Sequence, residues 1–269
     1  MNCKICESPT VIIFEKTVLK KHKVNYHQCN SCHFVQTDKV NWLHEAYSSA
    51  ITSLDIGLLN RNMRMLNEIP KLIDSCFPEA KIMLDYAGGY GVFTRLMRDH
   101  GYNFYRQDVY CENLFAKHFD IEDIKQQKFD LVTAFEVFEH FSDPLKEIEA
   151  LFEFSDNVVF STELIPPISN DIENWWYIAE ETGQHISFFS EQSLEYLAKK
   201  FSRHFYTKNR NLHLFSSKVL TTAQINFAFK DIKSKPIFFG LRTRPIYFHV
   251  QRESLLEKDF QMIRRLEHK

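Results

Sequence analysis

Residues 81–91 read KIMLDYAGGYG, an apolar run followed by an acid and then three clustered glycines. The 269-residue chain holds only seven glycines, so a cluster of three indicates a local backbone requirement. Glycine accepts positive φ angles and lets a ligand approach the main chain closely. The helix-like run VFTRLMR follows at 92–98. We therefore predict a strand at 81–86, a loop whose N–H groups face a nucleotide-like ligand, and a helix at 92–100.

The order of residues in this loop differs from that of a dinucleotide-binding loop, which reads G-x-G-x-x-G. Here Asp85 is followed by Ala87 and then by Gly88, Gly89 and Gly91. This order resembles the first motif of class I, Rossmann-like S-adenosylmethionine-dependent methyltransferases, roughly acid-x-G-x-G-x-G, with Ala87 at the first glycine. The resemblance implies that these five residues bind the cofactor. A tight turn in another α/β protein would also explain the loop taken alone.

Two later segments extend the resemblance. Residues 102–108 read as a second strand ending in Asp108, about 20 residues beyond the glycines, where a carboxylate can bind both ribose hydroxyls. Residues 129–144 read FDLVTAFEVFEHFSDP. In this methyltransferase class a near-identical run forms the fourth strand and the loop beside the methionine end of the cofactor. The resemblance therefore implies that Phe135 and Glu136 contact the cofactor.

Strand and helix patterns alternate through the middle of the chain. The predicted strands are 81–86, 102–108, a weaker one ending near 119–120, 129–135 and 157–162. A further helix begins at Pro144, a favoured first-turn position for proline, and continues to about Phe154. This alternation predicts a parallel sheet with helices on both faces and ligands at the carboxyl ends of the strands. With the resemblance, it implies an α/β fold with a Rossmann-like seven-stranded methyltransferase sheet and a small N-terminal zinc-ribbon-like module.

Two CxxC pairs near the amino terminus predict a metal site. They are Cys3 with Cys6 and Cys29 with Cys32, and 22 residues separate the pairs, slightly more than the commonest zinc-ribbon spacing. Each pair can form a knuckle, and two knuckles complete a tetrahedral four-thiolate site. Because four protein ligands leave no open position for water, we expect a structural Zn²⁺. Disulfides are disfavoured, since we expect no signal peptide and Cys76 and Cys111 show no comparable pairing.

Composition and charge exclude several other classes. Hydrophobic residues make up 44% of the chain and charged residues 25%, as in a globular enzyme with a sizeable core. No apolar stretch approaches the roughly 18 residues that span a membrane. The basic run at 20–23 reads as a solvated hairpin tip, and a net charge of −2 disfavours a dedicated nucleic-acid binder. We expect a cytoplasmic monomer or homodimer whose partner is a small molecule.

After the fifth strand, residues 163–190 depart from a minimal methyltransferase core. Two of the three tryptophans in the chain are adjacent there, and we expect this segment to lie over the methyl group of the cofactor. With the zinc module, it resembles bacterial sugar and glycan methyltransferases, including the sugar C-methyltransferases of deoxysugar pathways. The resemblance covers most of the chain and is strongest in 80–190. It implies a substrate pocket formed by Trp175, Trp176, Tyr177 and Gln184.

The same segment holds the candidate base. In the C-methyltransferases the histidine that corresponds to His185 deprotonates the substrate, and a preceding glutamate and tyrosine assist it. Here Gln184 stands for the glutamate and Thr182 for the tyrosine, which favours O-methylation. One histidine can take a hydroxyl proton while the oxygen attacks the sulfonium methyl group in line. His140, which follows Glu136 in the strand-four loop, is the alternative base.

Three classes of function remain open. The favoured one is methyl transfer to a hydroxyl of a sugar, sugar nucleotide or glycan intermediate, with sugar C-methylation as its variant. The second is methylation of an RNA or protein docked by the zinc module. The Asp/Asn-Pro-Pro-aromatic motif of base-modifying enzymes is absent, since FEVF occupies 135–138 and Pro166 and Pro167 follow strand five. The third is a non-catalytic cofactor-binding module, which the retained loop, ribose acid and histidine disfavour.

The predicted organisation has four parts. Residues 1–38 form the zinc-binding module, 39–78 a helical linker or lid, 79–220 the cofactor-binding core with the substrate insertion 163–190, and 221–269 a C-terminal extension. Residues 41–77 look helical, and Pro70 is expected to kink or break the helix.

Three features of the C-terminal part complete the sequence predictions. Residues 218–220 are expected to close a strand. Leu256, Phe260, Ile263 and Leu266 predict a final helix with one apolar face. Arg242 and Arg244 could bind a diphosphate, although a solvated loop is favoured for them.

Overall fold

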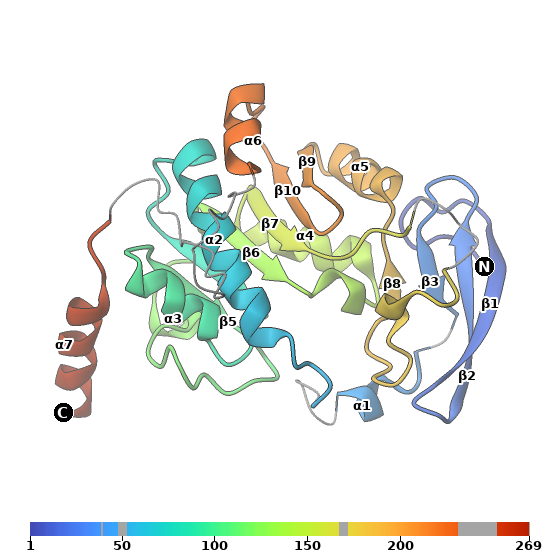
Figure 1. Ribbon diagram of the computed structural model, residues 1–269, viewed down its shortest axis with the longest axis horizontal. Coiled ribbons are helices and arrows are strands. Elements are labelled where there is room, and N and C mark those ends of the chain that lie inside the picture. Colours follow the sequence, from blue (N-terminus) through green and yellow to red (C-terminus); the bar gives the residue numbers. More distant parts are fainter. Residues whose placement is uncertain (39, 48–52, 167–171, 231–251, 269) are drawn as a thin grey trace, which may run out of the picture. The chain divides into compact units, whose positions relative to one another are not determined.

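The computed structural model describes residues 1–38, 40–47, 53–166, 172–230 and 252–268 (Figure 1). The chain divides into two compact units, each built from two separate segments. The first unit comprises Met1–Thr52 and Leu131–Lys218, and the second comprises Ser53–Asp130 and Val219–Lys269. Arg242 and Arg244 lie outside the described residues. Within the described ranges, no helix has both the length and the apolar character needed to cross a membrane.

The first unit opens with an antiparallel sheet of order β1-β2-β3-β8. Its strands are β1 (Thr10–Val18), β2 (His22–Cys29), β3 (Val35–Thr37) and β8 (Ser187–Phe188). Leu19 and Lys20 have φ angles of 52° and 57° at the β1–β2 turn, the region that tight hairpin turns require. Lys20, Lys21 and Lys23 are exposed there. The basic run therefore lies at a solvated hairpin turn.

A core of buried aromatic and aliphatic side chains joins this sheet to residues 172–188, which come after the fifth predicted strand. Phe14, Val18 and Tyr26 of the hairpin pack in one cluster with Tyr177 and Phe188. Trp42 also belongs to the cluster, and its indole Nε1–H donates to the Gly183 carbonyl at 2.8 Å. The N-terminal hairpin and residues 172–188 thus fold together.

A second group of strands in the first unit has the order β6-β7-β10-β9. The strands are β6 (Leu131–Phe135), β7 (Asn157–Ser161), β9 (His204–Lys208) and β10 (Leu212–Ser216). β6 and β7 are parallel, whereas β10 is antiparallel to both β7 and β9. The parallel pairing expected for 129–135 and 157–162 is therefore present, and an antiparallel hairpin, which needs only a short turn, adds two strands that make the sheet mixed. Residues 218–220 are not a strand, because β10 ends at Ser216.

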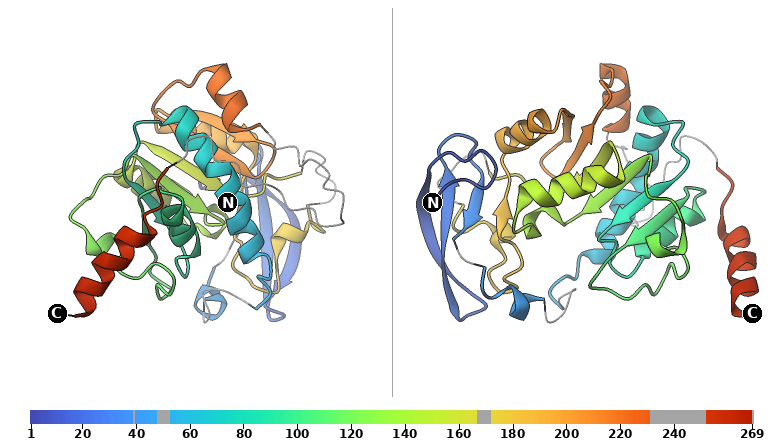
Figure 2. Two further views of the ribbon diagram at one scale, coloured as in Figure 1. Left: turned by 60° about the vertical axis from the view of Figure 1, so that its left-hand side comes forward. Right: turned by 180° about the vertical axis from the view of Figure 1, so that it is seen from behind.

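The helices of the first unit are α1 (Leu43–Ala46), α4 (Pro144–Phe154) and α5 (Glu191–Lys200), with 3-10 turns η2 (Phe138–His140) and η4 (Trp176–Ile178). α4 begins and ends where the sequence predicted. Asp143 caps it by accepting the Lys146 N–H, and Pro144 occupies its first turn. α4 packs on β7, as the view from behind in Figure 2 shows.

The second unit contains the parallel strands β4 (Met83–Tyr86) and β5 (Phe104–Gln107). Its helices are α2 (Leu58–Cys76), α3 (Val92–Asp99), α6 (Thr222–Ala228) and α7 (Leu256–Glu267), with the 3-10 turn η1 (Ile121–Asp123). α2 and α6 lie side by side (Figure 1). Pro70 lies inside α2 and does not end it.

Two further predictions need correction. The helix expected over 41–77 is divided into α1 and α2, with turns between them among the described residues. The weak third strand is reduced to a single bridge between Arg106 and Asp120, because Asp120 begins η1 as its cap. The described residues outside the N-terminal sheet therefore contain six strands, β4 to β7, β9 and β10, and not seven.

Candidate functional site

The glycine-rich loop lies in the second unit, between β4 and α3. Ala87, Gly89 and Gly91 have φ angles of 53°, 55° and 84°, and Gly91 caps α3. A Cβ atom on Gly88 would lie 2.5 Å from Asp85 Oδ2, so glycine is needed there for space. The buried Asp85 carboxylate accepts the Thr94 hydroxyl at 3.3 Å. The predicted cluster of glycines thus meets a backbone requirement, and Ala87 adopts the left-handed conformation without being glycine.

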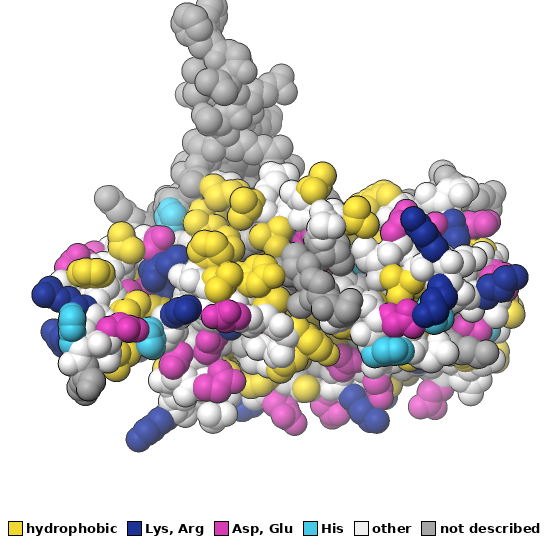
Figure 3. Space-filling model, turned by 90° about the horizontal axis from the view of Figure 1, so that it is seen from below, with side chains coloured by type: hydrophobic (Ala, Val, Ile, Leu, Met, Phe, Trp, Pro, Cys, Tyr) yellow, Lys and Arg dark blue, Asp and Glu magenta, His cyan; other side chains and the backbone are white. Residues whose placement is uncertain are grey.

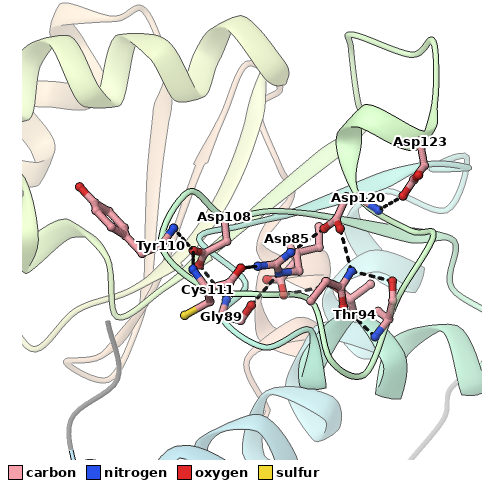
Figure 4. Close-up of polar contacts among 11 residues, drawn as sticks. Asp85, Gly89, Thr94, Asp108, Tyr110, Cys111, Asp120 and Asp123 are labelled. Atoms are coloured by element: carbon pink, nitrogen blue, oxygen red, sulfur yellow. Dashed lines mark hydrogen bonds and ion pairs between the residues drawn. The ribbon is translucent and has the colours of Figure 1, made fainter. Parts of the chain in front are cut away.

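Asp108 holds this loop from the end of β5. Its Oδ2 accepts the Gly89 N–H at 2.9 Å, and its Oδ1 accepts the N–H groups of Tyr110 and Cys111, each at 2.8 Å (Figure 4). A carboxylate offers about four lone-pair sites. Three are used by the backbone, which leaves Asp108 able to accept a further hydrogen bond from a ligand.

Arg106 is a residue of this site that the sequence analysis did not identify. Its buried guanidinium donates to the Gly89 carbonyl at 2.6 Å, to Asp120 Oδ1 at 2.7 Å, and to the Cys111 carbonyl. Asn113 donates to Asp120 Oδ2 at 3.0 Å, which ties the segment after β5 to the same network. The sequence did contain a signal for this role, since Arg106 lies within a short, half-apolar strand. A buried cation there requires hydrogen-bond acceptors or a carboxylate around it.

Apolar side chains on the surface accompany this loop. Val109, Tyr110, Leu114 and Phe115 follow Asp108 and are exposed. In the same unit, Ile56 and Leu59 are exposed around the start of α2. Figure 3 shows hydrophobic side chains gathered on the face that it views. The segment after β5 therefore offers both a carboxylate and apolar surface to a ligand.

The predicted histidines lie in the first unit, and the structure brings them together. Their ring centroids are 5.1 Å apart, although 45 positions separate His140 from His185 in the chain. The backbone explains the meeting, because the Ile186 N–H donates to the Glu139 carbonyl at 2.9 Å. The Ser187 hydroxyl adds a bond to the Phe141 carbonyl at 2.6 Å.

Backbone carbonyls fix the tautomers of both rings. His185 Nδ1 lies 2.7 Å from the Tyr177 carbonyl, and His140 Nδ1 lies 3.1 Å from the Gln184 carbonyl and 3.0 Å from the Tyr47 hydroxyl. A carbonyl can only accept, so each Nδ1 carries the hydrogen and each Nε2 keeps its lone pair. Burial lowers the pKa of His185 and lowers that of His140 to about 4. Both imidazoles are therefore neutral near pH 7.

Glu139 completes this group and was missed by the sequence analysis. Its side chain is 0% exposed, and among the described residues neither carboxylate oxygen has a hydrogen-bond partner. Burial, with the nearby charge of Glu136, raises the pKa of Glu139 to about 7. Glu139, His140 and His185 each offer a ligand atom, and these atoms lie within 4.8 Å of one another. The spacing E-x-x-E-H at 136–140 was the signal that could have identified this carboxylate.

Glu136 occupies a strained position next to this group. Its φ angle is 54°, unusual for a residue with a side chain. Its N–H donates to Ser161 Oγ at 2.9 Å, and the Ser161 hydroxyl donates back to Glu136 Oε1 at 2.6 Å. Phe135, the last residue of β6, is half-buried. The two residues expected to contact the cofactor thus lie at the carboxyl end of β6.

The predicted pocket residues differ in exposure. Trp176 is 72% exposed, whereas Tyr177 is buried with its hydroxyl 3.3 Å from Thr162 Oγ1. Gln184 is buried, and its amide donates to the Ala46 carbonyl at 2.9 Å. Trp175 packs against the core cluster of the N-terminal sheet. Tyr177 and Gln184 therefore stabilise the segment that contains them through buried contacts, and Trp176 exposes its aromatic ring to solvent.

The four N-terminal cysteines form a compact cluster. Their Sγ atoms are 3.6 Å apart for Cys3 and Cys32, 3.4 Å for Cys6 and Cys29, and 3.5 Å for Cys6 and Cys32. Zinc–sulfur bonds of about 2.3 Å in a tetrahedron would separate thiolates by roughly 3.8 Å. Backbone N–H groups at Ile5 and Ser31 point at Cys3 and Cys29, which is the geometry of a knuckle. The cluster fits one tetrahedral metal ion.

Comparison with protein families finds one match, to a model described as a methyltransferase domain, over residues 59–201. Comparison with curated proteins gives no match. Among solved structures, DesVI of Streptomyces venezuelae is similar at 14% identity, with 62% of this chain and 99% of that chain covered and a TM-score of 0.47. Magnesium protoporphyrin IX methyltransferase of Synechocystis PCC 6803, with bound SAH, is similar at 10% identity, with 66% and 96% covered and a TM-score of 0.40.

Proposed function

The chain belongs to the methyltransferase-domain family, and from this premise we propose that it transfers a methyl group from S-adenosylmethionine to a hydroxyl of a small, sugar-like acceptor. The observation that carries the donor assignment is the glycine loop, whose left-handed residues are held by the acid at the end of β5. The loop residues Asp85, Ala87, Gly88, Gly89 and Gly91 bind the donor in this proposal. Asp108 uses its remaining lone pair for the ribose, and the apolar side chains after it suit the adenine ring.

Phe135 and Glu136 are proposed to contact the methionine end of the donor. Glu136 suits this role because one of its carboxylate oxygens is already fixed by Ser161. A carboxylate held in one rotamer can receive an ammonium group without losing much conformational entropy. The strained backbone at Glu136 is consistent with a functional position.

His185 is proposed as the general base, with His140 as the alternative. A base must be neutral before it acts, and the lowered pKa of each imidazole keeps it so. As the acceptor oxygen attacks the methyl carbon, the O–H proton passes to the imidazole and the carbon–sulfur bond breaks. The products are the methyl ether, protonated histidine and S-adenosylhomocysteine. Alignment of oxygen, carbon and sulfur supplies much of the rate.

O-methylation is favoured over C-methylation by the residues beside His185. The Gln184 amide is occupied by the Ala46 carbonyl, and the Thr182 hydroxyl donates to the Ala179 carbonyl at 3.0 Å. Neither side chain can replace the glutamate and tyrosine that an enolate-forming reaction would use. The exposed Trp176, with Trp175 and Tyr177 behind it, is proposed to pack against the C–H face of a sugar ring.

The four-cysteine cluster is proposed to hold one structural zinc ion. The support is the near-tetrahedral spacing of the sulfur atoms and the N–H groups directed at them. Four thiolates leave no position for water or substrate, so the ion would stabilise the N-terminal sheet and take no part in methyl transfer.

The decisive experiment is incubation of the purified protein with methyl-labelled donor and separate panels of nucleotide sugars, glycans and RNA, followed by mass spectrometry. We expect the label in a sugar-containing small molecule, on oxygen. Label on a carbon atom of the sugar would replace O-methylation by C-methylation. Label in RNA alone, or in none of the panels while the donor still binds, would overturn the acceptor assignment.

A further inference from the structure

We infer that Glu139, His140 and His185 form a binding site for a first-row divalent metal ion, separate from the four-cysteine cluster. The three side chains lie in the first unit, and each offers one ligand atom within 4.8 Å of the others. Two imidazoles and one carboxylate form a ligand set that binds such ions and leaves coordination positions open. Metal bonds of about 2.0–2.2 Å require a modest inward movement of the three side chains.

The unpartnered carboxylate of Glu139 is the first argument. Burying a carboxylate is costly unless a cation or hydrogen bonds compensate it. In the part of the chain that the structure describes, neither oxygen makes a hydrogen bond of normal geometry; the Tyr177 hydroxyl lies close by as a weak donor, and no lysine or arginine pairs with the carboxylate. Glu136 adds a second negative charge nearby. A divalent cation would offset both charges.

The orientation of the histidines is the second argument. Histidines that bind metals commonly donate their other ring N–H to a carbonyl or carboxylate, which fixes the ring and its tautomer. Here the Tyr177 and Gln184 carbonyls play this part for His185 and His140. Both rings therefore keep a lone pair on Nε2, which a metal ligand needs. Both are half-buried and so retain an edge through which an ion can enter.

The local backbone provides a third argument. Glu139 and His140 are neighbours in the η2 turn, and the segment at Ile186 is hydrogen-bonded to the Glu139 carbonyl at 2.9 Å. Buried ring contacts fix the same region, since the His185 and Tyr177 centroids are 4.6 Å apart. A pre-formed group of ligands on rigid supports loses little entropy when it binds an ion.

The role of the ion rests on the proposed function, whereas its binding does not. Three protein ligands leave positions that water or an acceptor hydroxyl can occupy, and a bound cation lowers the pKa of such a hydroxyl. With the ion present, His185 serves as a ligand and no longer as the direct base. Without the ion, His185 keeps the task of taking the proton.

The test measures binding of Mn²⁺ alone, by electron paramagnetic resonance and calorimetry, with no donor or acceptor present. Because thiolates select zinc, the cysteines are first loaded with one equivalent of Zn²⁺ per chain, and free zinc, which would compete with Mn²⁺ for the imidazoles, is removed. We expect one Mn²⁺ per chain. Glu139→Gln and His185→Gln, which keep most of the side-chain volume, should each weaken binding by about 100-fold or more, beyond the 10–100-fold effect of an outer partner.

Matched controls remove the same groups from the exposed surface of the first unit. His204→Gln on β9 and Glu153→Gln on α4 should leave Mn²⁺ affinity unchanged. Absence of stoichiometric Mn²⁺ binding by the wild-type protein, or equal affinity in Glu139→Gln and wild type, would overturn the inference. Either result would leave methyl transfer by the histidines untouched. Conversely, Mn²⁺ binding without any methylated product would contradict the proposed function only.

Discussion

The carboxylate of Asp108 has two tasks at the scale of a single residue. It accepts three backbone N–H groups that shape the glycine loop, and it is the proposed partner of the ribose. His185 likewise is held by the Tyr177 carbonyl on Nδ1, which leaves the lone pair on Nε2. In both residues one part of the side chain is used for orientation, which leaves the other part positioned for a ligand.

Asp108→Ala should therefore weaken donor binding by about 1–3 kcal/mol, the usual effect of leaving polar partners unmatched. Calorimetric titration with S-adenosylhomocysteine measures this. Asp130→Ala is the matched control, because Asp130 also accepts two backbone N–H groups, from Lys81 and Ile82, outside the loop. The control should lower stability only; unchanged donor affinity in Asp108→Ala would refute the assignment.

His185→Ala should reduce turnover by about 10²–10⁴-fold, the typical effect of losing a general base, with little change in donor affinity. Steady-state rates with the labelled donor and an accepted substrate provide the measurement. If His140→Ala loses activity while His185→Ala keeps it, His140 is the base. Full activity in both variants would mean that alignment alone drives the reaction.

At the scale of helices and strands, α7 shows how an element can be held by charge. Its apolar residues Leu256, Phe260 and Leu266 are exposed, while Asp259 is its buried side chain. Asp259 accepts from Arg98 Nε and Nη2 at 2.8 and 2.7 Å, and from Arg95 Nη2 at 2.9 Å. The apolar face that predicted this helix is real, but it does not hold the helix in place.

Asp259→Ala should accordingly destabilise the second unit by about 3–5 kcal/mol, because it leaves the buried Arg98 without its carboxylate. Phe260→Ala on the same helix should change stability by less than about 0.5 kcal/mol. Denaturant unfolding of both variants compares the two effects. A larger loss from Phe260→Ala would show that the apolar face is buried in solution.

The strand β10 carries a buried histidine that makes stability depend on pH. His213 lies between Thr207 Oγ1 at 2.9 Å and the Thr162 carbonyl at 3.0 Å, and burial lowers its pKa to about 4. In the unfolded chain its pKa is about 6.5, so between these values the unfolded state binds more protons. The contribution of neutral His213 to the free energy of unfolding is present above pH 6.5 and is lost as the pH falls toward 4.

The size of this effect is of the order of 3 kcal/mol over that range. Unfolding free energies measured from pH 7 to pH 4 should therefore fall more steeply in the wild type than in His213→Gln. Glu139 changes the free energy of unfolding with pH in the opposite direction between pH 4.5 and 7. Because it is present in both proteins, its effect cancels in the comparison. Parallel pH profiles would contradict the assignment to His213.

Local sequence patterns predicted most of the helices and strands correctly. Contacts between segments far apart in the chain could not be predicted from the sequence. α3 and α4 were located within one residue because caps and glycines are local signals. The third strand failed because Asp120 caps a 3-10 turn and pairs with Arg106. In the site, the glycine loop is one contiguous motif and the cysteines lie in two short CxxC motifs. The grouping of Glu139 with His185 depends on a backbone hydrogen bond between segments far apart in the chain.

For the molecule as a whole, the cysteine cluster is connected to the candidate active site through the fold of the first unit. β3 pairs with β8, which begins two residues after His185, and Ser190 Oγ donates to the Cys32 carbonyl. The hairpin core also includes Tyr177, whose carbonyl orients His185. Loss of the metal should therefore affect methyl transfer without any direct contact between ion and substrate.

Metal analysis should find close to one zinc per chain when Mn²⁺ is not added. Cys29→Ser should increase hydrogen exchange in β1 to β3 and in residues 172–188, and it should lower turnover while donor affinity stays largely intact. Hydrogen exchange with mass spectrometry, together with donor titration, measures both. Protein purified without chelator that contains no metal, or a variant that is fully active with unchanged exchange, would disprove the zinc assignment.

The pairing of β3 with β8 also has a consequence for biosynthesis. During translation both cysteine pairs leave the ribosome long before Ser187 and Phe188, so β3 first exists with one open edge. Open strand edges invite pairing with other chains. Metal binding soon after the cysteines are synthesised would fix the hairpin and its register before β8 has been translated. The ion would then stabilise the incomplete sheet until its last strand is added.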